Sequence, residues 1–521
     1  MKSMSYSERF KVFFLNLDIN KEFTGIESAA MIRGKLMDQY LDLPSEFVNI
    51  YFNLMSPKYF EEYKQLGFAS TRTHRRNIFD WLYGEENRYP AENKPFEVPK
   101  DCTIAPVQET SFDKRLYKRG EILAYLKYDE QEERLLYINY LRHGKIWKRD
   151  WFGLDGRIHR TDYVDPKYET PDPVVEMYWS YSGQLAMLRD YEFSEDKKRT
   201  MRGIQCYSND QVQLCITDVD ELHKIYLESQ LDLNKINVLI LDRSKEYLKP
   251  ALQLRDKYPG KVKLVSLVHN THYVHGIHHP GDPMTSEVSS FYKEILLEPE
   301  KFDAIVFLTQ AQVADVETRF GPGVYHVVPH AIPNETPSKG LSRDLRRIVI
   351  PGRFAEEKQP HLAIEAFKLI HERVPDASLH FYGYGGKKDH MLELIKEHGL
   401  ESMVFLHDFV ADIGSVFQGA GLMMCSSRNE GFSITMLQSI QHGCPVVSFD
   451  CAYGPAELIK DGVNGFLVKP QSVTDLADTV CRVLLDADLH QSLISQCAGS
   501  VREFCEDRIA QRWASLLDDL A

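Results

Sequence analysis

The sequence lacks three patterns that would each indicate a particular class of protein. No stretch approaches the roughly 18–20 consecutive apolar residues of a membrane-spanning helix, and the polar segment Met1–Phe10 has no apolar region of a signal peptide. The nine cysteines are scattered and form no C-x-x-C pair, which argues against a disulfide framework or a zinc site. We therefore expect a cytoplasmic protein, held at the inner face of the membrane only by a partner or an amphipathic surface.

Basic residues are also fewer than acidic ones. The chain has 62 Lys and Arg against 76 Asp and Glu, a formal net charge of -14. A nucleic-acid binder usually carries a basic face, so we exclude nucleic acid as a partner, whereas a local basic groove for an anionic acceptor stays open. At roughly 100–200 residues per domain, the 521 residues predict about three domains.

Two parts of the chain alternate short, β-rich apolar runs with helical stretches, as parallel α/β domains do. The first part comprises residues 1–96 and 208–335. It opens with the apolar run Val12–Leu17, a turn at Gly25 and a helix from Ser28, which together begin a nucleotide-binding type of fold. Its later strands are expected at Val238–Asp242, Val262–His269 and Ala304–Leu308.

The second α/β part, residues 336–500, follows a linker at Pro333–Pro337. Two doubly wound domains leave a cleft between them, and ligands of such sheets bind beyond the carboxyl ends of the strands. The last segment, residues 501–521, is expected to be a helix that packs back on the N-terminal domain. The expected strands of the second part are Arg347–Pro351, Ala377–Tyr382, Leu422–Cys425 and Pro445–Phe449.

Residues 97–207, between the two pieces of the first domain, alternate apolar and polar side chains and are rich in aromatic residues. Ile122–Tyr128 and Leu135–Tyr140 are typical of such strands. We expect an antiparallel β-meander inserted into the N-terminal domain, which serves acceptor binding or oligomerisation. Turn signals recur at three glycines, Gly144, Gly156 and Gly183.

The loop after the strand Arg347–Pro351 carries two cations, Arg353 and Lys358. A leaving nucleoside diphosphate gains negative charge as the glycosidic bond breaks, so cations fixed there stabilise the transition state more than the ground state. Arginine offers a planar fork of donors and lysine a point charge, which suits a diphosphate without a metal ion. The alternative is a solvated helix start with an ion pair to Glu356 or Glu357.

The segment from Glu430 to Gln438 follows another expected strand and enters a helix near Ser433. The free N–H groups and the positive dipole end of a helix suit a phosphate, so Ser433, Ile434 and Thr435 are donor-binding candidates. Gln438 lies about a turn and a half into the helix, so that one polar group can hold sugar hydroxyls while the other reaches a ribose. The alternative is an ordinary capped helix.

Together these motifs resemble the family-four retaining glycosyltransferases, whose hallmarks are Arg-x4-Lys and Glu-x7-Glu in the C-terminal domain. Arg353 and Lys358 match the first hallmark, whereas the second begins with Glu430 and ends with Gln438 in place of Glu. The resemblance implies the GT-B fold, in which two Rossmann-like domains face a cleft. It continues in two later segments, Tyr453–Ile459 and Asp461–Val468.

The resemblance also implies roles for these residues. Arg353, Lys358 and the helix after Glu430 hold the diphosphate of a UDP-sugar, Glu430 contacts the sugar, and Gln438 contacts the ribose as donor or acceptor. The acceptor hydroxyl attacks from the face that the leaving group departs from, and the departing phosphate takes its proton. No cofactor or metal is expected. The base pocket is expected after a strand, at His407, Asp408 and Phe409.

Two positions in the first domain complete the expected site. At Gly25 the backbone can approach the donor closely, although a simple turn is the alternative. His269 ends a strand where related enzymes place a histidine near the donor sugar and the acceptor, so it joins the catalytic candidates. Four more histidines follow at His272, His275, His278 and His279. Their irregular spacing favours a polar acceptor-side loop, with His272 as a contact, over a metal site.

The insert resembles that of a subgroup of Gram-positive enzymes. This subgroup includes poly(glycerol-phosphate) glucosyltransferases, wall-teichoic-acid α-N-acetylglucosaminyltransferases and transferases that glycosylate serine-rich adhesins. Lys145, Lys148 and Arg149, with Trp147 and Trp151, could line a polyanion path, and a solvated sheet face is the alternative. A long hairpin array has edges that favour pairing with another chain, so a homo-oligomer is expected.

Three functions stay open. The favoured one is transfer of glucose or N-acetylglucosamine from a UDP-sugar to a teichoic-acid polymer, a polyol phosphate. The second is glycosylation of Ser or Thr on a serine-rich secreted protein. The third is a non-catalytic partner subunit, which Gln438 supports and the intact cationic motif opposes. A polyol-phosphate acceptor predicts strong salt dependence and loss of activity on charge reversal at Lys145 and Arg149.

Overall fold

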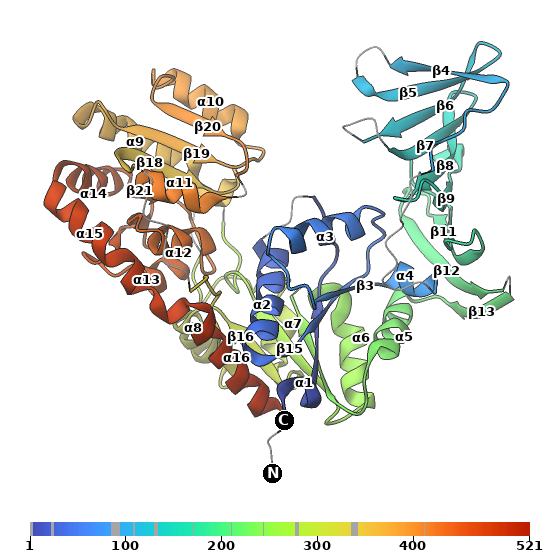
Figure 1. The fold of residues 1–521 in the computed structure, drawn as a ribbon, viewed down its shortest axis with the longest axis horizontal. Helices are drawn as coiled ribbons and strands as arrows, with labels where there is room; N and C mark the ends of the chain where they lie inside the picture. Colours follow the sequence, from blue (N-terminus) through green and yellow to red (C-terminus); the bar gives the residue numbers. More distant parts are fainter. Residues whose placement is uncertain are drawn as a thin grey trace. The chain divides into compact units, whose positions relative to one another are not determined.

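The computed structural model describes residues 4–21, 25–84, 94–107, 110–129, 134–168, 170–209, 211–242, 244–276, 281–334, 342–410 and 412–521. The chain divides into two compact units. The first unit comprises Met1–Asp38 and Leu43–Val262, and the second comprises Gln39–Asp42 and Lys263–Ala521. Three sheets carry the fold (Figure 1).

A seven-stranded sheet has the strand order β17-β16-β15-β14-β1-β2-β3. Strand β1 is central because four consecutive residues, Val12–Leu15, are at most 1% exposed, which requires cover on both faces of the sheet. It pairs in parallel with β2 and β14, with Phe13 opposite Leu239. The expected alternation of strand and helix is therefore confirmed, with the first strand starting two residues earlier than expected, at Phe10.

The elements of this Rossmann-like part have the following bounds. They are α1 (Tyr6–Arg9), β1 (Phe10–Leu15), α2 (Gly25–Leu41), β2 (Ser45–Asn49), α3 (Ser56–Gln65), β3 (His74–Asn77), α4 (Ile78–Leu82), α5 (Val219–Gln230), β14 (Ile236–Leu241), α6 (Ser244–Lys257), β15 (Val262–Val268), α7 (Lys293–Leu297), β16 (Ala304–Phe307), α8 (Gln310–Phe320) and β17 (Tyr325–Val327).

The insert is a ten-stranded antiparallel sheet in which every strand pairs with its neighbour in sequence, as a meander requires. It runs past the boundary predicted at residue 207, because Gln211–Ile216 forms a tenth strand paired with β12. The strands are β4 (Cys102–Val107), β5 (Thr110–Lys118), β6 (Glu121–Tyr128), β7 (Leu135–Arg142), β8 (Lys145–Phe152), β9 (Ile158–Tyr163), β10 (Val175–Trp179), β11 (Leu185–Phe193), β12 (Arg199–Ser208) and β13 (Gln211–Ile216).

Two-residue turns join some of these strands. His143 and Gly144 between β7 and β8 both have positive φ, 50° and 75°, as the type I′ hairpin turn demands. Arg119 and Gly120 between β5 and β6 have φ of 54° and 86° and make a second such turn, which was not predicted.

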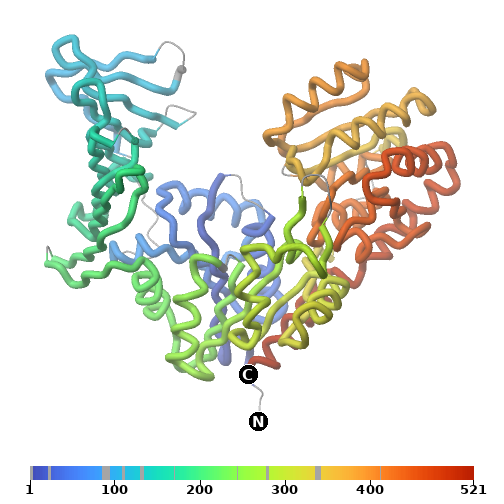
Figure 2. The backbone as a smooth tube through the Cα atoms, turned by 180° about the vertical axis from the view of Figure 1, so that it is seen from behind, coloured from blue at the N-terminus to red at the C-terminus, as the bar shows by residue number. Residues whose placement is uncertain are grey.

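The insert joins the Rossmann-like part of its own unit at one place, which we call the root of the insert. It begins after α4 and ends before α5, and these helices are neighbours (Figures 1 and 2), with the rings of Trp81 and Tyr226 5.5 Å apart. Tyr178 of β10 packs against Phe52 and Phe79 at 5.3 and 4.9 Å between ring centroids. Aromatic packing therefore fixes the sheet where it meets the Rossmann strands.

A buried carboxylate reinforces this root. Glu176 accepts hydrogen bonds from the hydroxyls of Tyr178 and Tyr191 at 2.8 and 2.9 Å. It also pairs with Arg160 and Arg199 at 3.0 and 2.7 Å. Burial alone would raise the pKa of Glu176, but these donors outweigh it, and the pKa is lowered. The carboxylate is therefore ionised in the folded protein.

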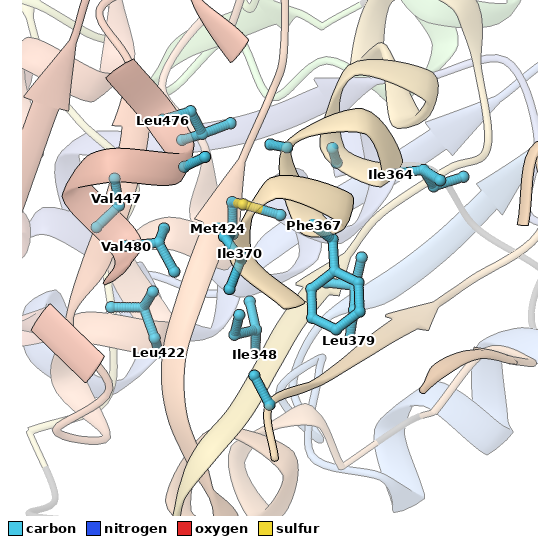
Figure 3. Close-up of a cluster of buried hydrophobic side chains, with 14 of the residues drawn as sticks. Ile348, Ile364, Phe367, Ile370, Leu379, Leu422, Met424, Val447, Leu476 and Val480 are labelled. Carbon is cyan, nitrogen blue, oxygen red and sulfur yellow. The ribbon is translucent and has the colours of Figure 1, made fainter. Parts of the chain in front are cut away.

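The third sheet, in the second unit, has the order β20-β19-β18-β21-β22-β23, and its strands pair in parallel. Figure 3 shows its core, where Ile348, Phe367, Leu379 and Leu422 lie together between the sheet and its helices, all fully buried. The tyrosine hydroxyl of Tyr40 donates to Glu506 at 3.3 Å, so the last helix contacts the end of α2.

The elements of the C-terminal part have the following bounds. They are β18 (Asp344–Pro351), α9 (Pro360–Arg373), β19 (Ser378–Tyr382), α10 (Lys388–Glu397), β20 (Val404–His407), α11 (Ile413–Gly419), β21 (Ala420–Cys425), α12 (Ile434–Gln441), β22 (Val446–Phe449), α13 (Gly454–Leu458), β23 (Gly465–Val468), α14 (Val473–Leu485), α15 (Ala487–Ser500) and α16 (Glu506–Leu520).

The first unit contains a buried ion pair whose loss we expect to be costly. Arg33 of α2 lies 3.0 Å from Asp242 after β14, with side chains 5% and 0% exposed. Arg33→Met leaves a buried carboxylate without its cation, so we expect a loss of about 3–5 kcal/mol in the free energy of unfolding. Urea unfolding followed by tryptophan fluorescence measures it, because four of the five tryptophans lie in this unit.

The control is the double variant Arg33→Met with Asp242→Leu, which removes both charges together. We expect it to recover most of the lost stability, since two apolar groups replace the pair. A double variant as unstable as the single one would contradict the assignment of the loss to the unpaired charge.

Candidate functional site

The cationic loop follows β18 at the carboxyl end of the second parallel sheet. The Arg353 side chain is 62% exposed and pairs with Glu357 at 2.6 Å, so the ion pair named as the alternative interpretation does form. Lys358 ends a short 3-10 helix, Glu356–Lys358, and turns toward the sheet instead. The two cations of the motif thus have different environments, one at the surface and one half-buried.

A glycine-rich run after β19, Gly383–Gly386, holds this loop in place. The Phe354 amide donates to the Tyr384 carbonyl at 2.8 Å, and the Lys387 amide donates to the Phe354 carbonyl at 3.0 Å. A Cβ at Gly383 or Gly385 would overlap the backbone of the cationic loop, so only glycine permits this approach. This run was not predicted, although a Gly-Tyr-Gly-Gly stretch directly after a strand was a usable signal.

Lys358 and Glu430 form the polar centre of the site. The Lys358 ammonium lies 2.7 Å from Glu430 Oε1, and the Ser427 hydroxyl donates to the same oxygen at 2.7 Å. Burial pushes the pKa of Lys358 down, but the attraction to Glu430 outweighs it, so the pKa is raised and the lysine is charged at neutral pH. Ser427 was not among the predicted residues.

These groups line one cavity of about 30 Å³ together with Arg353 and Thr435. The structure therefore brings Arg353, Lys358, Glu430 and Thr435, four predicted site residues, to the same place. They come from the loop after β18, the loop after β21 and the first turn of α12. A cavity with two cations, one carboxylate and a helix start is suited to an anionic ligand that also carries hydroxyl groups.

Helix α12 begins at Ile434, one residue after the predicted start. Ser433 precedes it with φ of 73°, a left-handed conformation that is uncommon for a residue with a side chain, and its hydroxyl lies 3.4 Å from that of Thr435. The Gln438 side chain is half-buried, and among the described residues its amide has no hydrogen-bond partner. That amide is therefore available to a ligand.

The backbone of His269 and Asn270 lies directly against the segment Asn429–Gly431. The Asn429 amide donates to Asn270 Oδ1 at 3.3 Å, and Gln312 donates to the Asn270 carbonyl at 2.8 Å. A Cβ on Gly431 would overlap the His269 carbonyl oxygen. The His269 ring stacks on His330 with centroids 6.2 Å apart. The His269 backbone thus contacts Gly431, the residue that follows Glu430. This packing was not predicted from the sequence.

His272 does not have the environment of an acceptor contact. It is fully buried, its Nε2 lies 3.3 Å from the Pro283 carbonyl, and its ring stacks on Tyr453. Burial lowers its pKa, so it is a neutral packing residue, and we correct its predicted role. His278 and His279 lie outside the described residues.

The candidates for the base pocket lie at the end of β20, as predicted. The His407 ring stacks on Tyr382 at 4.5 Å and on His380 at 5.2 Å. Asp408 and Phe409 are exposed, the latter 66%. An exposed phenylalanine beside a ring stack offers an apolar surface to a flat base.

The remaining candidates lie in the first unit. Gly25 is the first residue of α2, and a Cβ there would meet no atom of the described chain within 4 Å. The basic residues of β8 are divided between the two faces of the sheet, because Lys148 and Arg149 are adjacent in a strand. Lys148 pairs with Asp150 at 2.8 Å, and Lys145 is exposed.

Arg149 is held within its face. Its Nε donates to Asn139 at 2.6 Å, and its guanidinium lies over the rings of Tyr137 and Trp151 at 5.5 and 5.3 Å. Alternation along the strand therefore places Lys148 and Arg149 on opposite faces of the sheet.

Within the described ranges, no group of three or more metal-ligating side chains is placed to hold a metal ion. Over the same residues, none of the helices combines the length and the apolar character that crossing a bilayer requires.

Comparison with known proteins agrees with this geometry. Residues 332–498 match the model of the family described as glycosyl transferases group 1. The chain contains a group 1 glycosyltransferase domain. This range holds the cationic loop, Glu430 and α12, so the residues gathered around the cavity belong to the domain that defines the family.

Relatives that match almost all of this chain extend the comparison beyond residues 332–498. The poly(glycerol-phosphate) alpha-glucosyltransferase of Bacillus subtilis strain 168 is 22% identical, over 98% of this chain and 75% of its own length. The structure of a point mutant of S. aureus TarM, bound to fondaparinux, alpha-GlcNAc-glycerol and UDP, has a TM-score of 0.82 at 19% identity and covers 98% and 99% of the two chains. The pneumococcal O-GlcNAc transferase GtfA, bound to UDP and GlcNAc, has a TM-score of 0.67 at 16% identity, with the same coverage.

These similarities establish the fold of the whole chain. The glycosyltransferase has the GT-B fold, with an antiparallel sheet inserted in its N-terminal Rossmann-like domain, as the sequence predicted.

The close backbone contact at Gly431 gives a sharp test of the site. Gly431→Ala places a methyl group against the His269 carbonyl and must displace the segment that carries Glu430. Because a shift of about 1 Å in a catalytic group can cost roughly 100-fold in rate, we expect kcat/KM to fall by about that factor, measured as UDP release. The control is Gly499→Ala, where a Cβ would meet no described atom within 4 Å. Equal activity of both variants would contradict the assignment.

Proposed function

We propose that this glycosyltransferase moves glucose or N-acetylglucosamine from a UDP-sugar to a polyol-phosphate polymer of the teichoic-acid kind, with retention of configuration. One observation carries the proposal: Arg353, Lys358, Glu430 and Thr435 surround a single cavity at the carboxyl end of a parallel sheet. Cations for a diphosphate, a carboxylate for sugar hydroxyls and a helix start for phosphate are the groups that such a donor needs.

The donor is proposed to bind as follows. Lys358, Arg353 and the backbone at Ser433–Thr435 hold the diphosphate, and Glu430 binds hydroxyls of the sugar. Gln438 binds the ribose, and His407, Asp408 and Phe409 surround the base. Gly25 and His269 are proposed to approach the sugar from the N-terminal domain. Glu430 then has two functions, because its carboxylate also keeps Lys358 charged.

The reaction is proposed to run on one face of the sugar. The bond between the anomeric carbon and the phosphate oxygen breaks while a bond to the acceptor oxygen forms on the same side, and the leaving phosphate takes the acceptor proton. Lys358 and Arg353 stabilise the charge that gathers on this phosphate, so they act more strongly in the transition state than in the ground state. The configuration of the sugar is thereby retained.

Two observations support the acceptor class. A relative over 98% of this chain is named for alpha-glucosyl transfer to poly(glycerol phosphate). The solved structure with a TM-score of 0.82 holds a glycerol-linked sugar and UDP, whereas the peptide-type transferase GtfA reaches 0.67. Glycosylation of a serine-rich protein is therefore the second candidate, and a non-catalytic partner subunit is the third.

The insert is proposed to bring in the polymer and to pair with copies of the chain through its edge strand β13. Exposed Lys145 is its best placed cation for phosphate contacts. The enzyme is proposed to work in the cytoplasm, at the inner face of the membrane where polymer precursors are held.

Removal of the central cation tests the activity. For Lys358→Ala we expect kcat for sugar transfer to fall by roughly 100- to 1000-fold, the usual cost of losing one group that stabilises transition-state charge. UDP release is measured with UDP-glucose and UDP-N-acetylglucosamine, each with poly(glycerol phosphate), poly(ribitol phosphate) and a serine-rich peptide.

The matched control for this experiment is Lys460→Ala, which removes another lysine that pairs with a glutamate, here at the surface at 3.3 Å. Release that requires the peptide would move the enzyme to the protein-glycosylating class. If the wild type released no UDP with any pair, the transferase proposal would fail and the partner-subunit function would replace it.

The Gln438 position tests the donor-binding arrangement. In Gln438→Glu a charged acceptor replaces a neutral one, and such hydrogen bonds are stronger by about 1 kcal/mol. We therefore expect the KM for the UDP-sugar to fall about five-fold with little change in kcat, and to rise in Gln438→Ala. If both variants leave the donor KM unchanged, the residue does not contact the ribose.

A further inference from the structure

A buried arginine lies beside the proposed donor site. Arg428 follows β21 and comes two residues before Glu430 in the same loop. Its side chain is 7% exposed, which is uncommon, because arginine is almost never fully buried unless its charge is paired. Neither the cationic motif nor the glutamate motif includes this position, so its role has to be found from its contacts.

On one side, Arg428 is attached to the cationic loop. Its backbone amide donates to the Glu357 carbonyl at 2.8 Å, and its Nη2 lies 3.6 Å from Glu356 Oε1. Glu356 also pairs with Lys387. The hydrogen bond from Lys387 and the charges of both cations lower the pKa of Glu356, so this carboxylate is ionised at neutral pH and attracts the guanidinium.

On the other side, Arg428 is attached to the loop after β15, residues 269–276. Its Nη1 donates to the Gly276 carbonyl at 3.2 Å. Nearer the start of this loop, the Asn429 amide donates to Asn270 Oδ1 at 3.3 Å. Two consecutive residues of the loop after β21 thus hold the loop after β15, one near its start and one at Gly276.

The shape of the arginine suits this double attachment. A guanidinium presents donors in several directions of one plane, whereas a lysine ammonium is a point charge on a flexible stem. Arg428 therefore bonds a carbonyl of one loop and faces a carboxylate of another with separate nitrogens. Its third nitrogen, Nε, is buried and has no partner in the described chain. Because an apolar side chain would avoid the cost of this unbonded donor, the arginine indicates a role beyond the filling of space.

Arg428 is not a third cation for the diphosphate. The cavity of the donor site is lined by Ser427 and Glu430, which lie on either side of Arg428 in the sequence, but Arg428 is not among the lining residues. The guanidinium instead lies between two loops, each of which carries a proposed site residue. It can therefore influence the reaction only through the groups that it holds.

Other contacts hold Lys358 in place independently of the Arg428 side chain. The Ser426 hydroxyl lies 3.0 Å from the carbonyl oxygens of both Lys358 and Gln359, and Glu430 holds the ammonium. The loop after β15, by contrast, loses its hydrogen bond at Gly276 when the arginine is removed. Removal of the Arg428 side chain is thus expected to loosen this loop while the donor cation stays in position.

We propose that Arg428 is a positioning residue, which ties the loop after β15 to the cationic loop through Gly276 and Glu356. This inference rests on the proposed function, in which His269 of that loop approaches the transferred sugar and the loop lies on the acceptor side. Transfer requires the acceptor oxygen to be aligned with the anomeric carbon, so a loosened loop slows transfer. Hydrolysis of the donor by water needs no positioned acceptor and is affected less.

Two variants of the full-length protein test this role. Arg428→Gln removes the charge and shortens the fork, and Arg428→Lys keeps the charge but can reach only one of the two partners. The matched control is Arg346→Gln. Arg346 also bonds a carbonyl, that of Leu484, and pairs with a carboxylate, Asp376, at 3.3 Å, but it lies toward the amino end of β18. Circular dichroism reports whether each variant is folded.

The first measurement is amide hydrogen exchange, followed by mass spectrometry without any ligand. It reports on the loop directly, through groups such as the Val274 amide, which donates to the Glu287 carbonyl at 2.8 Å. We expect peptides over residues 270–276 to exchange about five-fold faster in both Arg428 variants than in the wild type and the control, with β15 unchanged. Unchanged exchange over residues 270–276 would overturn the proposal. Equally accelerated exchange in β15 would overturn it as well, because the arginine would then stabilise the whole sheet.

The second measurement separates transfer from donor binding. With the donor and acceptor that the wild type uses, we expect kcat for transfer to fall roughly 10- to 100-fold in both variants, since a displacement of about 1 Å can cost 100-fold. The KM for the donor, and donor hydrolysis without acceptor, should stay within about two-fold of the wild type. Full activity of Arg428→Lys would overturn the proposal, because a positive charge alone would then suffice.

The outcomes also distinguish this inference from the proposed function. If the wild type transfers sugar and the Arg428 variants transfer it equally well, the positioning role is wrong and the function stands. If transfer and donor hydrolysis fall together, Arg428 acts on the donor site and the positioning role is again wrong. If the loop exchanges as expected but the wild type turns over no donor and acceptor pair, the attachment of the loop stands and the proposed function fails.

Discussion

The ion pair between Lys358 and Glu430 is the interaction on which the proposed donor site depends. It joins the loop after β18 to the loop after β21, 2.7 Å between charged atoms, and the Ser427 hydroxyl completes it. Without Glu430, burial would lower the pKa of the lysine and weaken the cation that the proposed reaction needs. Without Lys358, the carboxylate would lose its cation. Glu430 thus maintains the positive charge of Lys358.

Glycines make this arrangement possible, since the loops around the pair approach one another backbone to backbone. The run Gly383–Gly386 supports the cationic loop, and Gly431 touches the His269 carbonyl. The consequence is a site whose geometry is set mainly by main-chain contacts, which are stiffer than contacts between long side chains. Substitutions at these glycines would displace the loops that carry Lys358 and Glu430, although the glycines themselves carry no reactive group.

Much of the fold was predictable from the pattern of apolar residues. A continuous apolar run such as Val12–Leu15 is typical of a strand in a parallel sheet covered on both faces, and an alternating run such as Ile122–Tyr128 is typical of an antiparallel strand. Arg353, Lys358 and Glu430 were predictable because their spacing forms a motif. Ser427 and Asn429 were not, since their role comes from loops that meet only in three dimensions. The division of Lys148 and Arg149 between two faces follows from strand alternation and could have been read from the sequence.

The root of the insert has a further consequence for how such enzymes diversify. The inserted sheet leaves after α4 and returns before α5, and these helices are neighbours whose rings lie 5.5 Å apart. An excursion with adjacent ends can be lengthened, shortened or replaced during evolution without rethreading the sheet that follows. Selection can therefore remodel the inserted sheet while the loops that carry Lys358 and Glu430 in the other unit stay unchanged.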